Sequence, residues 1–239
     1  MDLSPLIPGI RQRQKEEAQL LRNLTALLAF GQRALLSLLA TSYPHPGRLT
    51  GLVTTEEEGL EHVRRQPPDL LICSDELEAG DGVALIRRAK ALHPPLRAVL
   101  IMQRPTCRTL LAAVKAGTEG VCTDRLLATG AFHGALQAVL NDGSYLDRDA
   151  AAVLQRCRLE AGPPLAEPLS PRELEVLTLL SRGCSNPVIA DALIVSVDTV
   201  KSHVSSVLAK LNARDRTHAA VLALQHGVVK APPNPPAWV

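Results

Sequence analysis

Short apolar runs alternate with helical patterns along residues 26–140, and this alternation limits the possible folds more than any other sequence feature. Brief, continuously apolar runs bounded by turn residues are typical of strands buried on both faces. We therefore expect a five-stranded, parallel, doubly wound α/β sheet. The expected strands are Ala26–Phe30, Leu49–Val53, Leu70–Cys73, Ala98–Met102 and Gly120–Cys122, and the expected helices are Arg33–Ala40, Glu56–Arg65, Val83–Leu92, Arg108–Ala116 and Leu126–Leu140.

Two flanking segments set the domain boundaries. A charged helical pattern at Arg11–Asn23 precedes the first strand, and it is either a solvated helix lying on the domain or an extra dimer or partner surface. Residues 160–168 contain three prolines and a glycine, which is typical of an extended linker. We expect an N-terminal extension at 1–24, the α/β domain at 25–146, a helix (Arg148–Arg158) with the linker at 147–168, a helical domain at 169–230 and a tail at 231–239.

Composition excludes several classes of protein. The five cysteines are widely spaced and lack a Cys-x-x-Cys pair, which excludes the usual zinc spacings and argues against a secreted disulfide scaffold. We expect five thiols. The most apolar stretch, Thr25–Ala40, is too short to cross a bilayer, and we see no signal peptide. The expectation is a cytoplasmic protein without a membrane partner, a metal or another cofactor.

Three helices with strong start signals follow the linker. Residues 170–173, Ser-Pro-Arg-Glu, combine a capping serine, a proline at the first helical position and a glutamate that can reach back to the cap. The second helix starts at Asn186-Pro187, and Ser196 caps the third. A fourth helix is expected at about 216–226. Two short helices, a tight turn and a longer helix have the helix-turn-helix layout.

The third of these helices presents an unusual outward face. Lys201, Ser202, Ser205 and Ser206 point away from its apolar stripe, with Lys210 further along, and residues 199–212 contain no Asp or Glu. Lysine can reach guanine acceptors in a major groove, and serine can bond to bases or phosphates. The alternative is an ordinary solvated face. The net charge of the whole chain is only +2, so DNA binding must depend on where the charges lie.

These residues resemble the LuxR/NarL/FixJ helix-turn-helix family. The matching segments are 169–177, 183–190, 196–204 and 210–217, which follow one another in the family's order over about sixty residues. The resemblance implies base contacts from Lys201, Ser202 and Ser205. It implies phosphate contacts from Ser170, Asn186, Thr199 and Lys210, and a dimer contact from the small residues of the last helix, Ala219, Ala220 and Ala223.

The sequence departs from this family at two places. Ile194 stands where many members have glycine or a polar residue, and Pro187 replaces a common lysine, which removes one phosphate contact. His203 matches the motif, and we interpret it as a packing residue behind the recognition face in preference to a base contact.

The α/β segment resembles a response-regulator receiver domain of a two-component system, anchored at residues 68–74, 81–82, 116–120 and 142–146. The resemblance implies a Mg²⁺ site and a phosphoacceptor, but the aligned residues differ. Phe30-Gly31 stands where the carboxylates that bind Mg²⁺ are expected, and Ser74 stands at the position of the phosphoacceptor aspartate. Met102 replaces the switch hydroxyl, and Asp124 replaces the lysine that would pair with the phosphoryl group. Asp75 could substitute after a one-residue slip, but a slip reverses the side-chain direction on a strand. We expect a degenerate receiver.

The leading hypothesis is a non-enzymatic, dimeric transcription regulator that binds double-stranded DNA and is not controlled by aspartyl phosphorylation. Two alternatives remain open. The receiver-like domain could bind another regulator, which would make the chain an adaptor. Alternatively, Cys184 or Cys73 could act in thiol-based redox sensing, which needs an exposed thiol of low pKa.

Overall fold

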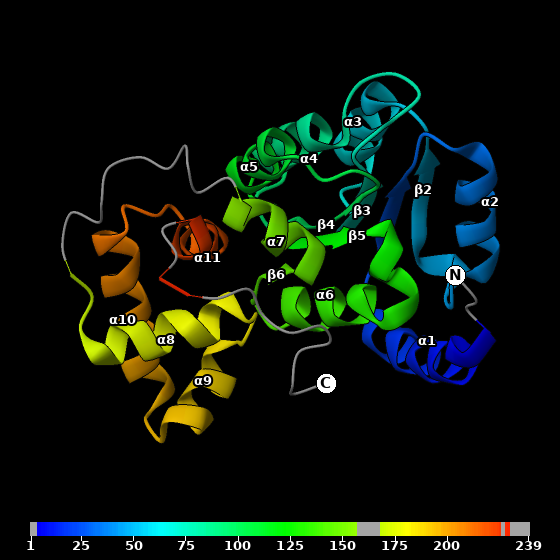
Figure 1. The fold of residues 1–239 in the computed structure, drawn as a ribbon. Coiled ribbons are helices and arrows are strands. Elements are labelled where there is room, and N and C mark those ends of the chain that lie inside the picture. The colour runs from blue at the N-terminus through cyan, green and yellow to red at the C-terminus, as the bar shows by residue number, and fades with distance from the viewer. Residues whose placement is uncertain (1–3, 157–167, 226–227, 230–239) are drawn as a thin grey trace.

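The computed structural model describes residues 4–156, 168–225 and 228–229. A six-stranded parallel sheet with strand order β2-β1-β3-β4-β5-β6 forms the first domain (Figure 1). Its strands are β1 (Ala26–Ala29), β2 (Leu49–Val53), β3 (Leu70–Ser74), β4 (Arg97–Met102), β5 (Gly120–Thr123) and β6 (Tyr145–Leu146). The predicted doubly wound fold is confirmed, but the count of five strands was one too low. β6 has two residues, too few to show a periodic pattern.

Helices surround this sheet and form the whole second domain (Figure 1). Those of the first domain are α1 (Ile7–Leu21), α2 (Arg33–Ser42), α3 (Glu56–Arg65), α4 (Gly82–Leu92), α5 (Cys107–Lys115), α6 (Ala131–Leu140) and α7 (Arg148–Arg156), with short 3₁₀ turns η1 (Ser4–Leu6), η2 (Pro46–Arg48) and η3 (Asp124–Thr129). The second domain contains α8 (Pro171–Ser181), α9 (Asn186–Leu193), α10 (Val197–Lys210) and α11 (Arg216–Gln225).

The sheet separates two hydrophobic clusters. Alternate strand residues such as Leu27 and Leu71 face α3, α4 and α5, whereas Leu28 and Ile72 face α1, α2 and α6. Side chains alternate between the faces of a strand, so a strand buried on both faces must be apolar throughout. The first cluster continues through α7 into the helical domain. The two domains therefore share one continuous apolar core.

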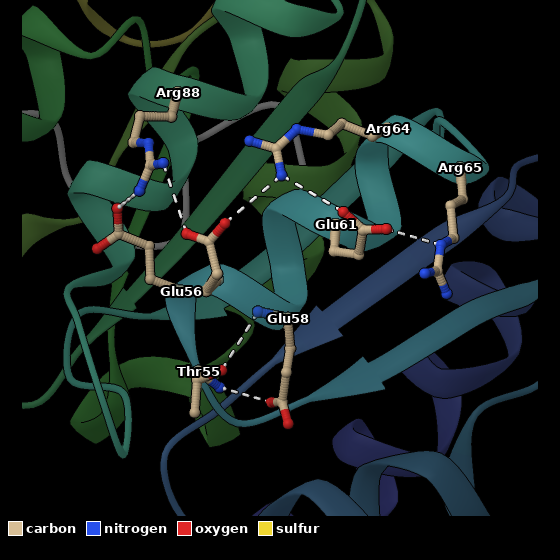
Figure 2. Close-up of polar contacts among 8 residues, drawn as sticks. Thr55, Glu56, Glu58, Glu61, Arg64, Arg65 and Arg88 are labelled. Atoms are coloured by element: carbon tan, nitrogen blue, oxygen red, sulfur yellow. Dashed lines mark hydrogen bonds and ion pairs between the residues drawn. The ribbon is translucent and has the colours of Figure 1, made fainter.

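Local signals in the sequence explain where α3 begins and how it is held on α4. Thr55 accepts a hydrogen bond from the Glu58 backbone N–H while the Glu58 carboxylate accepts from the Thr55 N–H, forming a capping box (Figure 2). Arg88 of α4 forms an ion pair with Glu56 of α3 at 2.8 Å. This pair is partly exposed, so we expect it to contribute little beyond orientation.

Helix α11 packs between the two domains. It packs on α8 and α10 of its own domain and on α7 and α5 of the first domain, and Figure 1 shows it between them. Arg214 donates an Nη1 hydrogen bond to the carbonyl of Lys115, at the end of α5, at 3.2 Å. The predicted last residue of this helix, 226, and the last two residues of the helix predicted at Arg148–Arg158 lie outside the described residues. No single described helix has both the length and the apolar character needed to span a membrane.

Candidate functional site

Helix α10 carries Lys201, Ser202 and Ser205, which we expected to contact DNA bases. Its N-cap is Ser196, whose hydroxyl accepts from the Thr199 N–H at 3.0 Å. The buried side of the helix includes Val200 and Val207, and the opposite side is open to solvent. Lys201 is 62% exposed and forms an ion pair of 3.0 Å with Asp198, which is itself 88% exposed. The receiver-like domain therefore does not cover this face in the structure.

The serines on this face have hydroxyls engaged within the helix. Ser202 and Ser205 are both exposed, and each donates a hydrogen bond of 3.0 Å to a carbonyl four residues earlier in the chain. Such back-bonding is a common resting state for a helical serine. A hydroxyl of this kind can rotate to another partner, so both side chains are available for contacts with a ligand.

The structure brings two of the predicted phosphate contacts together around one carboxylate. Ser170 caps α8 by accepting from the Glu173 N–H, and Glu173 accepts in return from the Ser170 N–H at 2.7 Å. Lys210, from the end of α10, forms an ion pair with the same carboxylate at 2.8 Å, and Ser206 donates to its other oxygen at 2.7 Å. These contacts, of which the Lys210 bond is the largest cause, lower the pKa of Glu173 to about 2.

The remaining predicted phosphate contacts lie at the starts of α9 and α10. Thr199 is exposed in the first turn of α10. Asn186, at the first residue of α9, accepts a hydrogen bond of 3.5 Å from Arg216 of α11. Sequence reasoning missed Arg172, which donates to the Leu193 carbonyl at 2.7 Å and so holds α8 against the turn before α10. Its position beside the Ser170 cap gave no signal of this role.

The predicted dimer residues do not form a free surface here. Ala219, Ala220 and Ala223 are 0%, 2% and 0% exposed, and they belong to the cluster that links the two domains. The three residues are covered within a single chain in this conformation, and the predicted dimer contact stays a prediction. The sequence pattern marked α11 as a helix with small contact residues, but it could not say which domain would cover them.

The carboxyl end of the sheet is where a receiver would hold its metal. A Cβ added at Gly31 would lie 2.9 Å from the carbonyl oxygen of Glu76, because the loop after β3 folds over this position. Ser74 is buried, and its hydroxyl donates to the Glu76 carbonyl at 2.6 Å. The other two positions that align with receiver active-site residues differ in exposure. Met102 is fully buried, whereas Asp124 is exposed at the start of η3.

These residues do not fit the Mg²⁺ ion that a receiver fold implies. Magnesium requires several oxygen ligands in near-octahedral geometry. Within the described ranges, no cluster of three or more His, Cys, Asp or Glu is placed to hold a metal. Asp75 is the carboxylate adjacent to Ser74, and burial is the main cause that raises its pKa. Its Oδ1 has no hydrogen-bond partner among the residues described.

The two cysteines singled out from the sequence do not provide an activated thiol. Cys73 and Cys184, the two candidates from the sequence, are buried. Burial raises the pKa of the Cys184 thiol to about 11 and also raises that of Cys73. A raised pKa disfavours the reactive thiolate. Cys107 is disulfide-bonded, so the expectation of five thiols was wrong for this residue, because sequence spacing does not reveal distances between cysteines.

The C-terminal part of the chain is similar to a known family. Residues 167–223 match the family model described as bacterial regulatory proteins, luxR family. With the six-stranded parallel sheet before it, the matched segment makes the chain similar in architecture to response regulators, in which a receiver-like α/β domain precedes a luxR-type helix-turn-helix domain.

Named relatives are similar over most of their length. The response regulator protein VraR of Staphylococcus saprophyticus is 28% identical over 174 residues, covering 73% of this chain and 82% of that protein. VraR of Staphylococcus aureus is 29% identical over 176 residues, with the same shares.

Solved structures support the fold. A structure described as a complex of the two-component response regulator RcsB with DNA has a TM-score of 0.50 and 21% identity, covering 84% of this chain and 98% of that one. A LuxR-family two-component response regulator from Aurantimonas has a TM-score of 0.51 and 17% identity, covering 57% and 98%.

Proposed function

We propose that this protein is a sequence-specific, DNA-binding transcription regulator. The observation that carries the proposal is the open face of α10, on which Lys201, Ser202 and Ser205 are exposed in a domain that matches the luxR family. A helix with a lysine and small hydroxyls fits the width of the major groove and can read base edges there. The ion pair between Lys201 and Asp198 is exposed, so exchanging it for a DNA contact costs little.

The starts of three helices supply the expected phosphate contacts. Ser170 at α8, Asn186 at α9 and Thr199 at α10 lie where free N–H groups and the positive end of the helix dipole attract phosphates. Lys210 adds a positive charge, although its partial neutralisation by Glu173 makes it a weaker contact than its sequence position suggested. These contacts would fix the orientation of α10 without reading sequence.

We further propose that the active form is a dimer on two half-sites. Recognition helices related by a two-fold axis should then lie roughly 34 Å apart, one turn of DNA. If α11 is the dimer helix, as the family resemblance implies, it must first leave α7 and α5, because it packs on both of them and its small residues are buried. Dimerisation and separation of the domains would then occur together.

We also propose that aspartyl phosphorylation does not control this regulator. Two observations support this part of the proposal. The loop after β3 packs closely over Gly31, and a serine, Ser74, stands at the position of the phosphoacceptor. The full chain can be incubated with acetyl phosphate and Mg²⁺ and its intact mass measured. We expect no added phosphoryl group. A stoichiometric mass increase that disappears in Asp75→Asn would contradict this part of the proposal.

Selection from a random pool of DNA duplexes tests the DNA-binding proposal, because the operator sequence need not be chosen in advance. We expect the full-length chain to enrich a site with two similar halves spaced by about one helical turn. Binding to the enriched duplex should weaken steeply between roughly 50 and 200 mM salt, as expected for several phosphate contacts. A pool that shows no enrichment after repeated rounds at low salt would contradict sequence-specific binding.

A second candidate function is that of an adaptor, and exposed leucines on α2 favour it. Leu35 and Leu38 are 36% and 62% exposed on a helix that lies at the edge of the sheet. Affinity capture with the full chain and with Leu38→Asp tests this role. A protein retained in stoichiometric amount by the wild type, and lost with the variant, would support it. Equal retention by both would exclude this surface.

A further inference from the structure

A cavity of about 550 Å³ lies beneath the N-terminal helix, between α1, α2 and the sheet. Its floor consists of Leu28, Ile72 and Ile101, which come from the neighbouring strands β1, β3 and β4. Helix α1 packs on α6 and η3, whereas α2 packs on β2, and the cavity remains between these two helices. Its volume falls within the range of roughly 300–1,000 Å³ that is common for small-molecule sites.

The aromatic residues of the chain are concentrated in this cavity. The protein has two phenylalanines, two tyrosines and one tryptophan. Both phenylalanines, Phe30 and Phe132, and one tyrosine, Tyr43, line the cavity. They come from the end of β1, from α6 and from the end of α2, so three separate elements contribute a ring. Rings gathered in this way favour a flat, ring-bearing occupant, because aromatic pairs gain energy beyond the area they bury.

Polar groups are concentrated on one wall. Arg13, Gln14 and Glu17 lie within about one turn of α1 and line the cavity. Arg13 is engaged at its far end, where Nη2 donates to the carbonyl of Ala128 at 2.6 Å. Burial is the main cause that raises the pKa of Glu17 to about 7, so near neutral pH this carboxyl can donate as well as accept. The wall therefore suits a hydrogen-bonding group that carries no charge.

One buried polar group is left over beside this wall. The hydroxyl of Tyr43 is buried and has no hydrogen-bond partner among the described residues. A buried donor without a partner costs free energy, and natural structures rarely retain one without a reason. Tyr43 lines the cavity, so a change of its χ1 torsion would move the hydroxyl toward an occupant.

We propose that this cavity is a binding site for a neutral, ring-bearing hydrophobic small molecule with one hydrogen-bonding group, which lies with its rings on the sheet and its polar group toward α1. In this proposal α1 forms one wall of a pocket within the receiver-like domain. The sequence had suggested only a solvated helix or a dimer or partner surface. It is independent of DNA binding, so its failure would leave the proposed function intact.

The test uses N-phenyl-1-naphthylamine, an uncharged dye with two ring systems whose fluorescence rises in apolar sites. Titrated with the full-length protein, it should bind saturably with one site per chain. Absence of saturable binding would overturn the proposal. Hydrogen exchange on the same complex should show added protection in residues 7–21 and 33–42. Saturable binding that protects other segments instead would place the dye elsewhere and would also overturn it.

Two matched pairs of variants locate the dye. Leu39→Trp fills the cavity from α2, whereas Leu38→Trp places the same ring on the neighbouring residue, which is exposed to solvent. Ile10→Trp and Ile7→Trp form the equivalent pair on α1. We expect at least roughly tenfold weaker dye binding for each cavity variant and unchanged binding for its partner, with circular dichroism confirming the fold. Equal dissociation constants within both folded pairs would contradict the site.

Competition defines the class of ligand. 2-Naphthol and 1-decanol have the same number of carbon atoms and one hydroxyl each, but only the first has rings. We expect 2-naphthol to displace the dye at roughly tenfold lower concentration than 1-decanol, and the reverse order would overturn the ring-bearing class. A second copy of the chain is the competing occupant. Dye binding that weakens as protein concentration rises would identify it and would count against a small molecule.

Discussion

At the scale of single residues, Ile194 is held in an unfavourable backbone conformation. It has a φ of +56° at the turn between α9 and α10, and it is 92% exposed, so packing gains little from its side chain. A β-branched residue in the left-handed region costs roughly 1–2 kcal/mol. The residue lies in the turn at which the chain bends by 107° between α9 and α10.

Replacing Ile194 with glycine should therefore stabilise the protein. We expect Ile194→Gly to raise the free energy of unfolding by about 1 kcal/mol in urea denaturation. Asn212, with a φ of +50°, supplies the matched control, because asparagine tolerates this region well. Asn212→Gly should change stability by less than half as much. A destabilised Ile194→Gly protein would show that the side chain makes contacts that outweigh the strain.

Glu173 is the residue on which the start of α8 and the end of α10 converge. The Lys210 ion pair and the hydrogen bonds lower its pKa to about 2, below its ordinary value of 4.5. A lowered folded-state pKa means that the unfolded chain binds the proton more readily. The stabilisation is therefore complete well above pH 4.5 and declines as the pH falls toward about 2.

Glu173→Gln should thus destabilise the protein most near neutral pH. We expect a loss of about 1–3 kcal/mol at pH 7, because two helices lose a charged partner, and a smaller loss at about pH 3.5. Glu175→Gln on the same helix is the control, since its pair with Arg172 is 54% exposed on the glutamate side. Similar losses for both variants, or a loss that does not depend on pH, would refute this account of the Glu173 pKa.

At the scale of helices and strands, the cap of α3 shows how a local signal sets an element boundary. Thr55 and Glu58 form a reciprocal capping box, a pattern that the spacing of a threonine and a glutamate three residues later favours (Figure 2). We expect Thr55→Ala to cost about 1 kcal/mol in thermal or urea unfolding. Arg65→Ala, which removes an exposed ion pair with Glu61 on the same helix, should cost less than half of that. Equal effects would mean that the cap is not a main determinant of stability here.

Features encoded by neighbouring residues could be predicted from the sequence, and features that depend on distant ones could not. The caps at Thr55, Ser170 and Ser196 and the apolar strands follow from local chemistry. The strand β6 was missed because it is defined by pairing with β5, not by its own pattern. The ion pair of Lys210 with Glu173 joins residues 37 apart in the chain. The burial of α11 and the cavity under α1 likewise arise only when distant elements pack together.

At the scale of the whole molecule, one apolar core passes through both domains and α11 lies within it. Helix α10 belongs to the same domain as α11, but its open face remains exposed to solvent. A change that loosens α7 from α11 would therefore alter the dimer contact that we propose for α11 without altering the residues of α10 that we propose to read DNA. The cavity under α1 lies on the other side of the sheet from the cluster that reaches α11.

The exposed face of α10 is the surface that reads DNA in our proposal, and Lys201 tests it most directly. Fluorescence anisotropy on a duplex enriched by selection should give a dissociation constant for the wild type, Lys201→Ala and Arg65→Ala. Arg65 is a matched cation, 77% exposed on α3 and far from α10 in the sequence. We predict that Lys201→Ala weakens specific binding by about 1–3 kcal/mol, roughly 5- to 150-fold, while Arg65→Ala binds like the wild type. Wild-type affinity for Lys201→Ala would contradict the account.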